Sequence, residues 1–415
     1  EIYTLSLHDA LPIFGRSVWL DAVSDWIGTT DPLSRNKIHR RQPDPQSTVF
    51  LRKILAESQR PFFIAGRLAN PHDALAVSGI ARSLNIPLYA DLSSGLRFDG
   101  TFAPLQQALL SREFSERFRP DAIIHFGGPL ITARVATAIS RTWKPRHHVV
   151  IKPDTNRYGP EHNITLSIDA APKLVAEALY GCREPIREAQ LPLPDLFFAK
   201  TSDMLDEFCG ADRQVSEISV ARILSRLAGK AEGVFVSNSM PVRYMDLYAD
   251  TGDLPHLSIG MNRGASGIDG IISTAAGFAE GLGKLVTLVI GDIAFLHDLN
   301  ALSLLRSLSA PLRIVVVNNG GCGIFSFLPI AAEQDCFETY FATPQQYSVR
   351  DAAATFGVVY SKPETNRELE ALLKDGKHDP ACRIIEISGS REENARQHRE
   401  LQSKISALAA TFLKR

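Results

Sequence analysis

The chain has 415 residues, 45% of them hydrophobic, and a net charge of −1, which is enough length and apolar content for two or three domains with separate cores. The balanced charge offers no basic excess for nucleic acid or an anionic membrane surface, and no apolar run approaches the roughly 20 residues of a membrane-spanning helix. The five cysteines are scattered without a Cys-x-x-Cys pair, which argues against a disulfide framework and a zinc site and favours a reducing compartment.

The amino-terminal residues do not resemble the start of a native domain. Residues 1–14 lack an initiating Met, a basic segment and a small-residue cleavage site, so we expect a non-native leader rather than a signal peptide. Residues 15–47 contain Trp19 and Trp26 and then a polar stretch with three prolines. This composition predicts the remnant end of a preceding domain, followed by a linker.

Residues 48–182 alternate short apolar segments with helical patterns. Strands are expected at 61–65, 87–90, 122–126 and 147–151, and helices at 71–84, 131–140 and 172–180. This alternation predicts a small doubly wound α/β domain with a parallel sheet. Prolines at 185, 192 and 194 then predict a linker over residues 183–215.

Residues 216–415 form the second predicted α/β domain. Strands are expected at 233–236, 257–259, 285–290, 313–317, 358–360 and 383–387, and helices at 219–227, 271–281, 299–308, 349–356, 366–373 and from 392 onwards. A right-handed strand–helix–strand crossover places consecutive parallel strands side by side, so that their carboxyl ends meet at one edge of the sheet. Asp292 and Asn319 follow two such strands, and open parallel sheets bind ligands at that edge.

The two strand ends carry hard oxygen donors and glycines. The carboxylate of Asp292, the amide oxygen of Asn319 and a backbone carbonyl at Gly321 suit Mg²⁺, which keeps its other positions for phosphate oxygens and water. Gly320, Gly321 and Gly323 allow the backbone to approach a diphosphate and direct N–H groups towards it. The residues therefore predict a metal–diphosphate site, with ordinary turn or helix-cap roles as the alternative.

Four short segments together resemble one known family. Gly-Asp at 291–292, a spacing of 27 residues from Asp292 to Asn319, and then Asn-x-Gly are similar to the thiamine diphosphate signature GDG…NN, with Ile293 at its third position. The segments SNSMPVR, NRGASGIDG, GDIAFLHD and GIFSFLP, which begin at residues 237, 262, 291 and 323, resemble the MenD family of 2-succinyl-5-enolpyruvyl-6-hydroxy-3-cyclohexene-1-carboxylate synthases. The resemblance extends over roughly residues 16–400.

The resemblance implies the fold of the thiamine diphosphate enzymes, with 48–182 as the central domain and 216–415 as the diphosphate-binding domain. It implies a transferase that uses thiamine diphosphate and Mg²⁺ or Mn²⁺ in menaquinone or phylloquinone biosynthesis. The implied reaction decarboxylates 2-oxoglutarate and adds the succinyl semialdehyde carbanion to isochorismate. A homodimer or tetramer with the active site at the subunit interface is also implied, in the cytoplasm or, in a photosynthetic eukaryote, the plastid stroma.

The family pattern also implies roles for individual residues. The implied cofactor-binding residues are Gly291, Asp292, Ile268, Asn319, Gly321 and Gly323, of which Asp292, Asn319 and Gly321 would bind the metal. Ile268 would hold the cofactor in its bent V shape, or would serve only as core. Ile324 and Phe325 would pack over the cofactor and substrate, with plain core packing as the alternative.

Substrate binding is implied for Arg243, Arg263 and Ser239. A guanidinium group offers a planar, bidentate fork to the carboxylates of 2-oxoglutarate and isochorismate, whereas surface ion pairs are the alternative role. The family often carries a basic pair after the strand at 122–126, but here the pair is Ala133 and Arg134. This departure leaves the contribution of the central domain to substrate binding open.

Two other functions remain open at this point. The family activates its cofactor with a glutamate from an amino-terminal pyrimidine-binding domain of the partner subunit, and no acid of this chain matches it. The chain could therefore be an inactive cofactor-binding fragment, which the addition of an intact pyrimidine domain would test. Another thiamine diphosphate carboligase or decarboxylase is the second alternative, and assays with pyruvate and 2-oxoglutarate would distinguish it.

Overall fold

The computed structural model describes residues 26, 29, 41–68, 70–98, 105–154, 156, 159, 162–180, 195–229, 232–250, 252, 257–375 and 382–414. The chain divides into two units, 1–40 and 41–415, and every described residue except Trp26 and Thr29 lies in the second. The predicted leader, most of the predicted domain remnant and the linker residues 183–194 lie outside the described residues.

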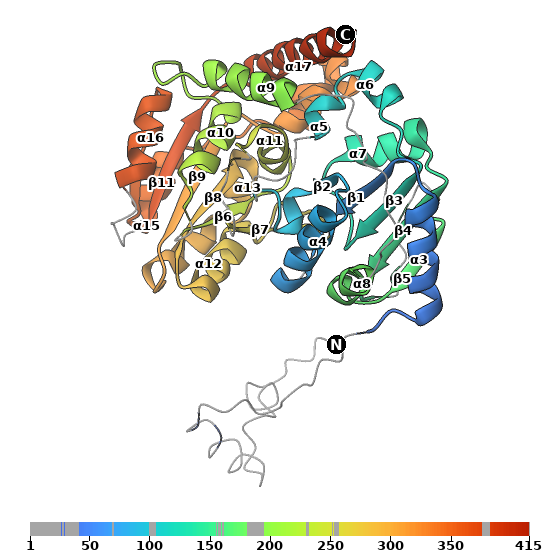
Figure 1. Ribbon diagram of the computed structural model, residues 1–415. Helices are drawn as coiled ribbons and strands as arrows, with labels where there is room; N and C mark the ends of the chain where they lie inside the picture. Colours follow the sequence, from blue (N-terminus) through green and yellow to red (C-terminus); the bar gives the residue numbers. More distant parts are fainter. Residues whose placement is uncertain are drawn as a thin grey trace, which may run out of the picture. The chain divides into compact units, whose positions relative to one another are not determined.

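The first α/β region is built around a five-stranded parallel sheet with the strand order β2-β1-β3-β4-β5 (Figure 1). The strands are β1 (Pro61–Ala65), β2 (Leu88–Ala90), β3 (Ala122–Phe126), β4 (His147–Lys152) and β5 (Leu166–Asp169). The helices are α3 (Pro45–Glu57), α4 (Pro71–Ser83), η2 (Leu92–Ser94), α5 (Leu105–Ala108), α6 (Arg112–Arg117), α7 (Ala133–Thr137), the π-helical η3 (Ala138–Trp143) and α8 (Pro172–Leu179). Every residue of β1 and β3 is buried, because α3, α4 and α8 cover one face of the sheet and α5, α6 and α7 the other.

The second α/β region contains a six-stranded parallel sheet with the strand order β10-β11-β9-β8-β6-β7 (Figure 1). The strands are β6 (Glu232–Val236), β7 (Ser258–Met261), β8 (Leu285–Gly291), β9 (Leu312–Asn318), β10 (Val359–Ser361) and β11 (Arg383–Ser388). The helices are α10 (Glu217–Leu227), α11 (Met240–Tyr248), α12 (Ile271–Leu282), α13 (Asp292–His297), η4 (Leu299–Arg306), η5 (Gly323–Phe327), η6 (Pro329–Ala332), α14 (Gln334–Cys336), η7 (Phe337–Ala342), α15 (Val349–Phe356), α16 (Asn366–Asp375) and α17 (Arg391–Leu413). The predicted fold class, two doubly wound parallel-sheet regions, is confirmed.

Part of the predicted linker is a helix. Residues 195–208 form α9 (Asp195–Phe208), so the linker prediction is wrong for this segment. Phe197, Thr201 and Leu205 recur at every fourth position and are almost fully buried, which is the pattern of a helix with one apolar face. The prolines that indicated a linker all precede the helix.

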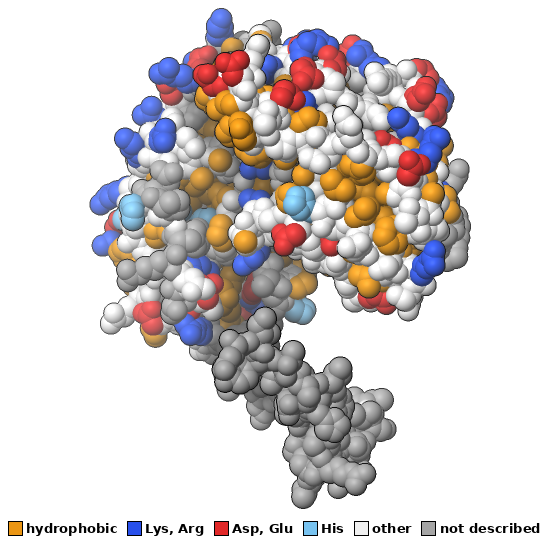
Figure 2. Space-filling model, turned by 180° about the vertical axis from the view of Figure 1, so that it is seen from behind, with side chains coloured by type: hydrophobic (Ala, Val, Ile, Leu, Met, Phe, Trp, Pro, Cys, Tyr) orange, Lys and Arg blue, Asp and Glu red, His pale blue; other side chains and the backbone are white. Residues whose placement is uncertain are grey.

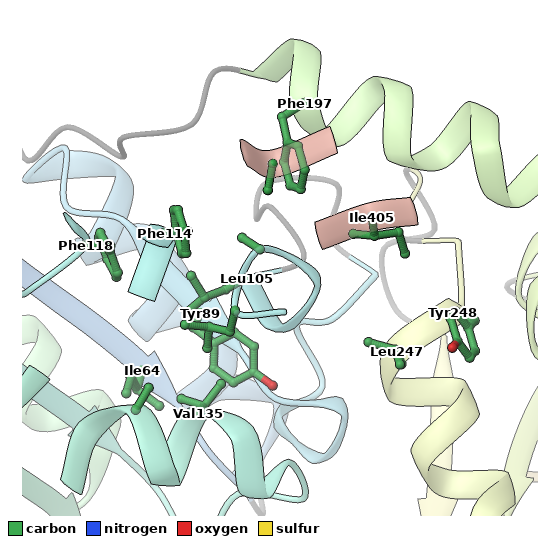
Figure 3. Close-up of a cluster of buried hydrophobic side chains, with 14 of the residues drawn as sticks. Ile64, Tyr89, Leu105, Phe114, Phe118, Val135, Phe197, Leu247, Tyr248 and Ile405 are labelled. Carbon is green, nitrogen blue, oxygen red and sulfur yellow. The ribbon is translucent and has the colours of Figure 1, made fainter. Parts of the chain in front are cut away.

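The carboxyl-terminal helix α17 packs against both α/β regions. It contacts α5 and α6 of the first region as well as α9 and η5. Figure 3 shows the shared apolar core, to which the first region contributes Ile64, Tyr89, Leu105, Phe114, Phe118 and Val135, α9 contributes Phe197, α11 contributes Leu247 and Tyr248, and α17 contributes Ile405. A 2.6 Å hydrogen bond between the Tyr248 hydroxyl and His398 Nδ1 also joins α11 to α17. Burial of this core fixes how the two regions meet.

The surface carries mixed charge. Figure 2 shows basic and acidic side chains interspersed over one face, with apolar side chains gathered between them. Among the described residues, no helix has both the length and the apolar composition needed to cross a membrane.

A buried histidine makes the stability of the first region sensitive to acid. His125 in β3 is 3% exposed, hydrogen-bonds through Nε2 to the carbonyl of Gly128 at 3.0 Å, and stacks on His148. Burial, and then the neighbouring His148, lowers the pKa of His125 from 6.5 to about 3. The unfolded chain therefore gains a proton below about pH 6.5 that the folded chain does not bind, so the free energy of unfolding falls as the pH drops towards 3.

We expect His125 to contribute about 2 kcal/mol to the loss of unfolding free energy between pH 7 and pH 5. Urea unfolding of the wild type and of His125→Gln at both pH values measures this difference, and the variant should lose less stability on acidification. His72→Gln, which removes an exposed histidine in the first turn of α4, is the matched control. Equal pH dependence in the wild type and His125→Gln would contradict the assignment.

Candidate cofactor site

The two strand ends predicted to meet do lie side by side. β8 and β9 are parallel neighbours, with Gly291 paired to Val317 in the ladder. Asp292 is the first residue of α13, and its Oδ2 accepts a 2.8 Å hydrogen bond from the N–H of Gly321, beyond the end of β9. Its Oδ1 accepts a second 2.8 Å bond from the N–H of Ile293. The prediction that both loops reach one edge of the sheet is confirmed.

The edge gathers buried acidic and amide groups. Asp292 is 4% exposed, and burial raises its pKa while the backbone N–H groups of Gly321 and Ile293 lower it. Glu217, the first residue of α10, is 8% exposed, and burial raises its pKa to about 7, helped by the charge of Asp292. Asn319 Nδ2 donates to Glu217 Oε1 at 2.7 Å, whereas the buried Asn319 Oδ1 has no hydrogen-bond partner in the described part of the chain.

These groups fit a divalent cation bound to a diphosphate. A buried carboxylate and an orphaned amide oxygen are costly by themselves, and a hard cation would stabilise both. Among the described residues, there is no group of three or more His, Cys, Asp and Glu side chains placed to hold a metal. The predicted donors are of a different kind, because they combine the Asp292 carboxylate, the Asn319 amide and the backbone carbonyl of Gly321.

The loop after β9 depends on glycine at two positions. Gly321 has a φ of +135°, and a Cβ there would lie 2.3 Å from the carbonyl oxygen of Ala342. A Cβ at Gly323 would lie 2.8 Å from Nδ2 of Asn319. A side chain is therefore excluded at position 321, and one at position 323 would displace the amide of Asn319.

The opposite wall of the cavity comes from the loops after β6 and β7. Asn238 joins them, because its Nδ2 donates to the carbonyl of Gly267 at 2.6 Å and its Oδ1 accepts from Arg263 Nη1 at 3.3 Å. Ser239, the residue before α11, has a φ of +70°, a strained conformation for a residue with a side chain. Arg243 donates to the Ser239 carbonyl at 2.5 Å, and partial burial and then the charge of Arg263 lower the pKa of Arg243.

The structure brings most of the predicted residues to one cavity. Its lining includes the predicted Ser239, Ile268, Gly291, Asp292, Asn319, Gly321 and Gly323, together with Glu217, Ser237, Asn238, Met240, Pro241, Ile293, Ala294, Val317 and Cys322, for which no role was predicted. Arg243 and Arg263 are not part of this lining. Arg243 lies on α11 and donates to the carbonyl of Ser239, and Arg263 lies on the loop after β7 and donates to Asn238.

Ile324 and Phe325 are placed differently from the expectation. Neither lines the cavity; Ile324 packs against the apolar core shared by the two regions, and Phe325 forms an edge-to-face contact with Phe341 at 5.5 Å between ring centroids. Ile324 therefore has a core contact in this chain, whereas the ring contact of Phe325 is with Phe341. Arg134 is also away from the cavity, with Nη1 donating to the carbonyl of Gln106 at 3.4 Å beside the shared core.

Comparison with known proteins assigns the site to a family. A family model described as "Middle domain of thiamine pyrophosphate" matches residues 17–236, and "Thiamine pyrophosphate enzyme, C-terminal TPP binding domain" matches residues 258–387. The 2-succinyl-5-enolpyruvyl-6-hydroxy-3-cyclohexene-1-carboxylate synthase of Chlorobium limicola is 60% identical over 397 residues, which are 96% of this chain and 68% of that protein. The chain belongs to the MenD family.

Other MenD synthases and a more distant enzyme extend this comparison. The synthase of the same name from Chlorobium luteolum is 49% identical over 404 residues, covering 97% of this chain and 69% of that protein, so the chain spans about two thirds of the length of these relatives. Benzoylformate decarboxylase from Polynucleobacter necessarius has a TM-score of 0.62 at 16% identity, covering 88% of this chain and 68% of that one. At that identity, the likeness shows a shared fold.

Proposed function

We propose that this chain catalyses the reaction for which the MenD family is named, using 2-oxoglutarate and isochorismate as substrates, thiamine diphosphate as cofactor and Mg²⁺ or Mn²⁺ as the metal. One observation carries the proposal: Asp292, the Asn319 amide and the Gly321 loop meet in one cavity of a family member. We further infer a homodimer or tetramer with the active site at the subunit interface, as the family resemblance implies.

The diphosphate end of the cofactor would lie against the β8 and β9 edge. Asp292, Asn319 and Gly321 would hold the metal, and Ile268 on the cavity wall would support the bent cofactor. Bound thiamine diphosphate supplies the carbon nucleophile and the electron sink for decarboxylation. The chain itself positions the groups and excludes water, because most of the cavity lining is buried.

The two arginines supply the charge that a dicarboxylate needs. Arg243 and Arg263 are close enough for the charge of one to lower the pKa of the other, so a bound carboxylate would relieve their repulsion. Ser239 connects Arg243 to the cavity, since its carbonyl accepts from Arg243 and the residue is part of the cavity lining. This arrangement favours 2-oxoglutarate over pyruvate, which lacks the second carboxylate.

The donor substrate provides the test. We expect kcat/KM for product formation with isochorismate to be roughly 10- to 100-fold higher with 2-oxoglutarate than with pyruvate, because a hydrogen bond to a charged group contributes about 1.5–3 kcal/mol. The assay is run on the full chain with thiamine diphosphate and Mg²⁺. A second preparation adds the part of the Chlorobium limicola synthase that has no counterpart in the match to this chain. Equal use of pyruvate, or no product from 2-oxoglutarate in either preparation, would contradict the proposal.

A further inference from the structure

Glu217 is a buried acid in the cofactor cavity that no sequence motif indicated. It comes from the first turn of α10, 102 residues before the amide that it contacts. It lines the cofactor cavity and also a second cavity formed with Gln214, Ser388 and Asn394. It is therefore part of the wall between them and is held at 8% exposure.

The contact with Asn319 fixes which end of that amide faces the cavity. Asn319 Nδ2 donates to Glu217 Oε1 at 2.7 Å, so Oδ1 is turned away from the carboxylate. A half-turn of the amide would place an oxygen acceptor against a carboxylate oxygen and would lose the hydrogen bond. Glycine at position 323 leaves room for the amide in this orientation, because a Cβ there would lie 2.8 Å from Nδ2.

This orientation of the Asn319 amide determines the surroundings of its Oδ1. This oxygen is buried and has no hydrogen-bond partner within the described residues. The nearby N–H groups of Ile293 and Gly321 donate to the Asp292 carboxylate. Buried amide oxygens are normally paired, so an unpaired one in a cofactor cavity indicates a missing ligand. The negative charge of Asp292 also acts on the carboxyl group of Glu217 and raises its pKa.

We propose that Glu217 is a positioning residue of the cation site, which holds Asn319 so that Oδ1 points at the metal. The inference rests on the proposed metal–diphosphate role of Asp292 and Asn319. Glu217 does not coordinate the cation; it acts through the amide, as the residues behind metal ligands do in other sites. Removal of the carboxylate leaves the amide free to turn and to hydrate through the space that opens.

The variants separate the hydrogen bond from the rest of the side chain. Glu217→Ala removes the acceptor, whereas Glu217→Gln retains an Oε1 that can accept from Asn319 Nδ2. The adjacent residue offers a matched control, because Asn318 Nδ2 donates to Glu386 Oε1 at the same 2.7 Å, and neither residue lines the cofactor cavity. Glu386→Ala thus removes the same kind of contact from the same strand end without touching the site.

Mn²⁺ is the probe, and free Mn²⁺ is measured by electron paramagnetic resonance in the presence of thiamine diphosphate. We expect Glu217→Ala to weaken Mn²⁺ binding about 10- to 100-fold, and Glu217→Gln and Glu386→Ala to stay within about 3-fold of the wild type. In the Asn319→Ala background, Glu217→Ala should cause no further loss. This non-additivity distinguishes a positioning role from a general loss of folding. Far-ultraviolet circular dichroism of each variant checks separately that the protein is folded.

Two results would overturn the inference without affecting the proposed function. These are wild-type Mn²⁺ affinity in Glu217→Ala, and an equal loss in Glu217→Ala and Glu217→Gln. A wild-type chain that binds no Mn²⁺ with thiamine diphosphate would instead refute the metal site itself, and the positioning role would be refuted with it.

Discussion

Substitution of Asp292 is expected to abolish retention of metal and thiamine diphosphate. Asp292→Ala should weaken Mn²⁺ and cofactor binding by more than about 100-fold. Mutation of a residue that only hydrogen-bonds to a metal ligand typically lowers metal affinity about 10- to 100-fold, and loss of the ligand itself should cost more. Titration of the cofactor, followed by fluorescence quenching at fixed Mg²⁺, measures this loss. An unchanged affinity would refute the assignment of Asp292 to the metal.

Asp292 also has a structural role that the experiment must separate from metal binding. Its carboxylate ties α13 to the loop after β9 through Gly321, and its carbonyl accepts a 2.8 Å bond from the hydroxyl of Tyr347. Asp292→Asn keeps an oxygen that can accept from one N–H but removes the charge. We expect Asp292→Asn to fold like the wild type and still lose the metal; metal binding at wild-type strength in this variant would favour the turn or cap role.

The second large effect concerns the buried ion pair where the two α/β regions meet. Arg97 Nη2 lies 3.3 Å from Asp246 Oδ1 on α11, and both side chains are at most 5% exposed. Arg97 also donates to the carbonyl of Ala90 at 2.8 Å. Burial raises the pKa of Asp246 to about 6, and the charge of Arg97 lowers it.

We expect Asp246→Ala to lower the free energy of unfolding by about 3–5 kcal/mol, because it leaves the buried Arg97 charge without its carboxylate partner. The double substitution Arg97→Met with Asp246→Leu should recover most of that loss, since it removes both charges and fills the space. Urea unfolding of the three proteins tests this order. Glu116→Ala, which breaks the exposed pair with Arg112, is the control and should change little. If the double variant proved less stable than Asp246→Ala, the buried-charge explanation would fail.

Local sequence was sufficient to predict which strand ends form the sheet edge at the site. The apolar runs of β8 and β9 end at Gly-Asp and Asn-Asn-Gly-Gly, and the general handedness of crossovers makes such strands neighbours. Predicted strand positions therefore placed Asp292 beside Gly321 correctly. The segment after β8 was less predictable. Residues 292–297 form α13, where no helix was expected, and the helix expected at 299–308 is the 3-10 helix η4 over Leu299–Arg306.

The contact of Asp298 shows that the partner of a helix-capping side chain can depend on tertiary packing. Asp298 precedes the predicted helix at 299–308 and is the residue type that caps a helix. In the structure, its Oδ2 accepts a 2.9 Å bond from the N–H of Ser273, in the first turn of α12. Only the packing of α12 against η4 creates that contact.

The sequence by itself determined the two α/β regions, the Asp292 and Asn319 strand ends and the family, because each depends on short-range periodicity or on contiguous residues. Tertiary structure alone decided the role of α17 in the shared core, the burial of Arg97 against Asp246, and the contact of Glu217 with Asn319. A glutamate after Ser216 is an ordinary helix start in sequence. The role of Glu217 depends on its contact with the amide of Asn319, 102 residues away, and local sequence does not indicate which distant groups the fold brings together.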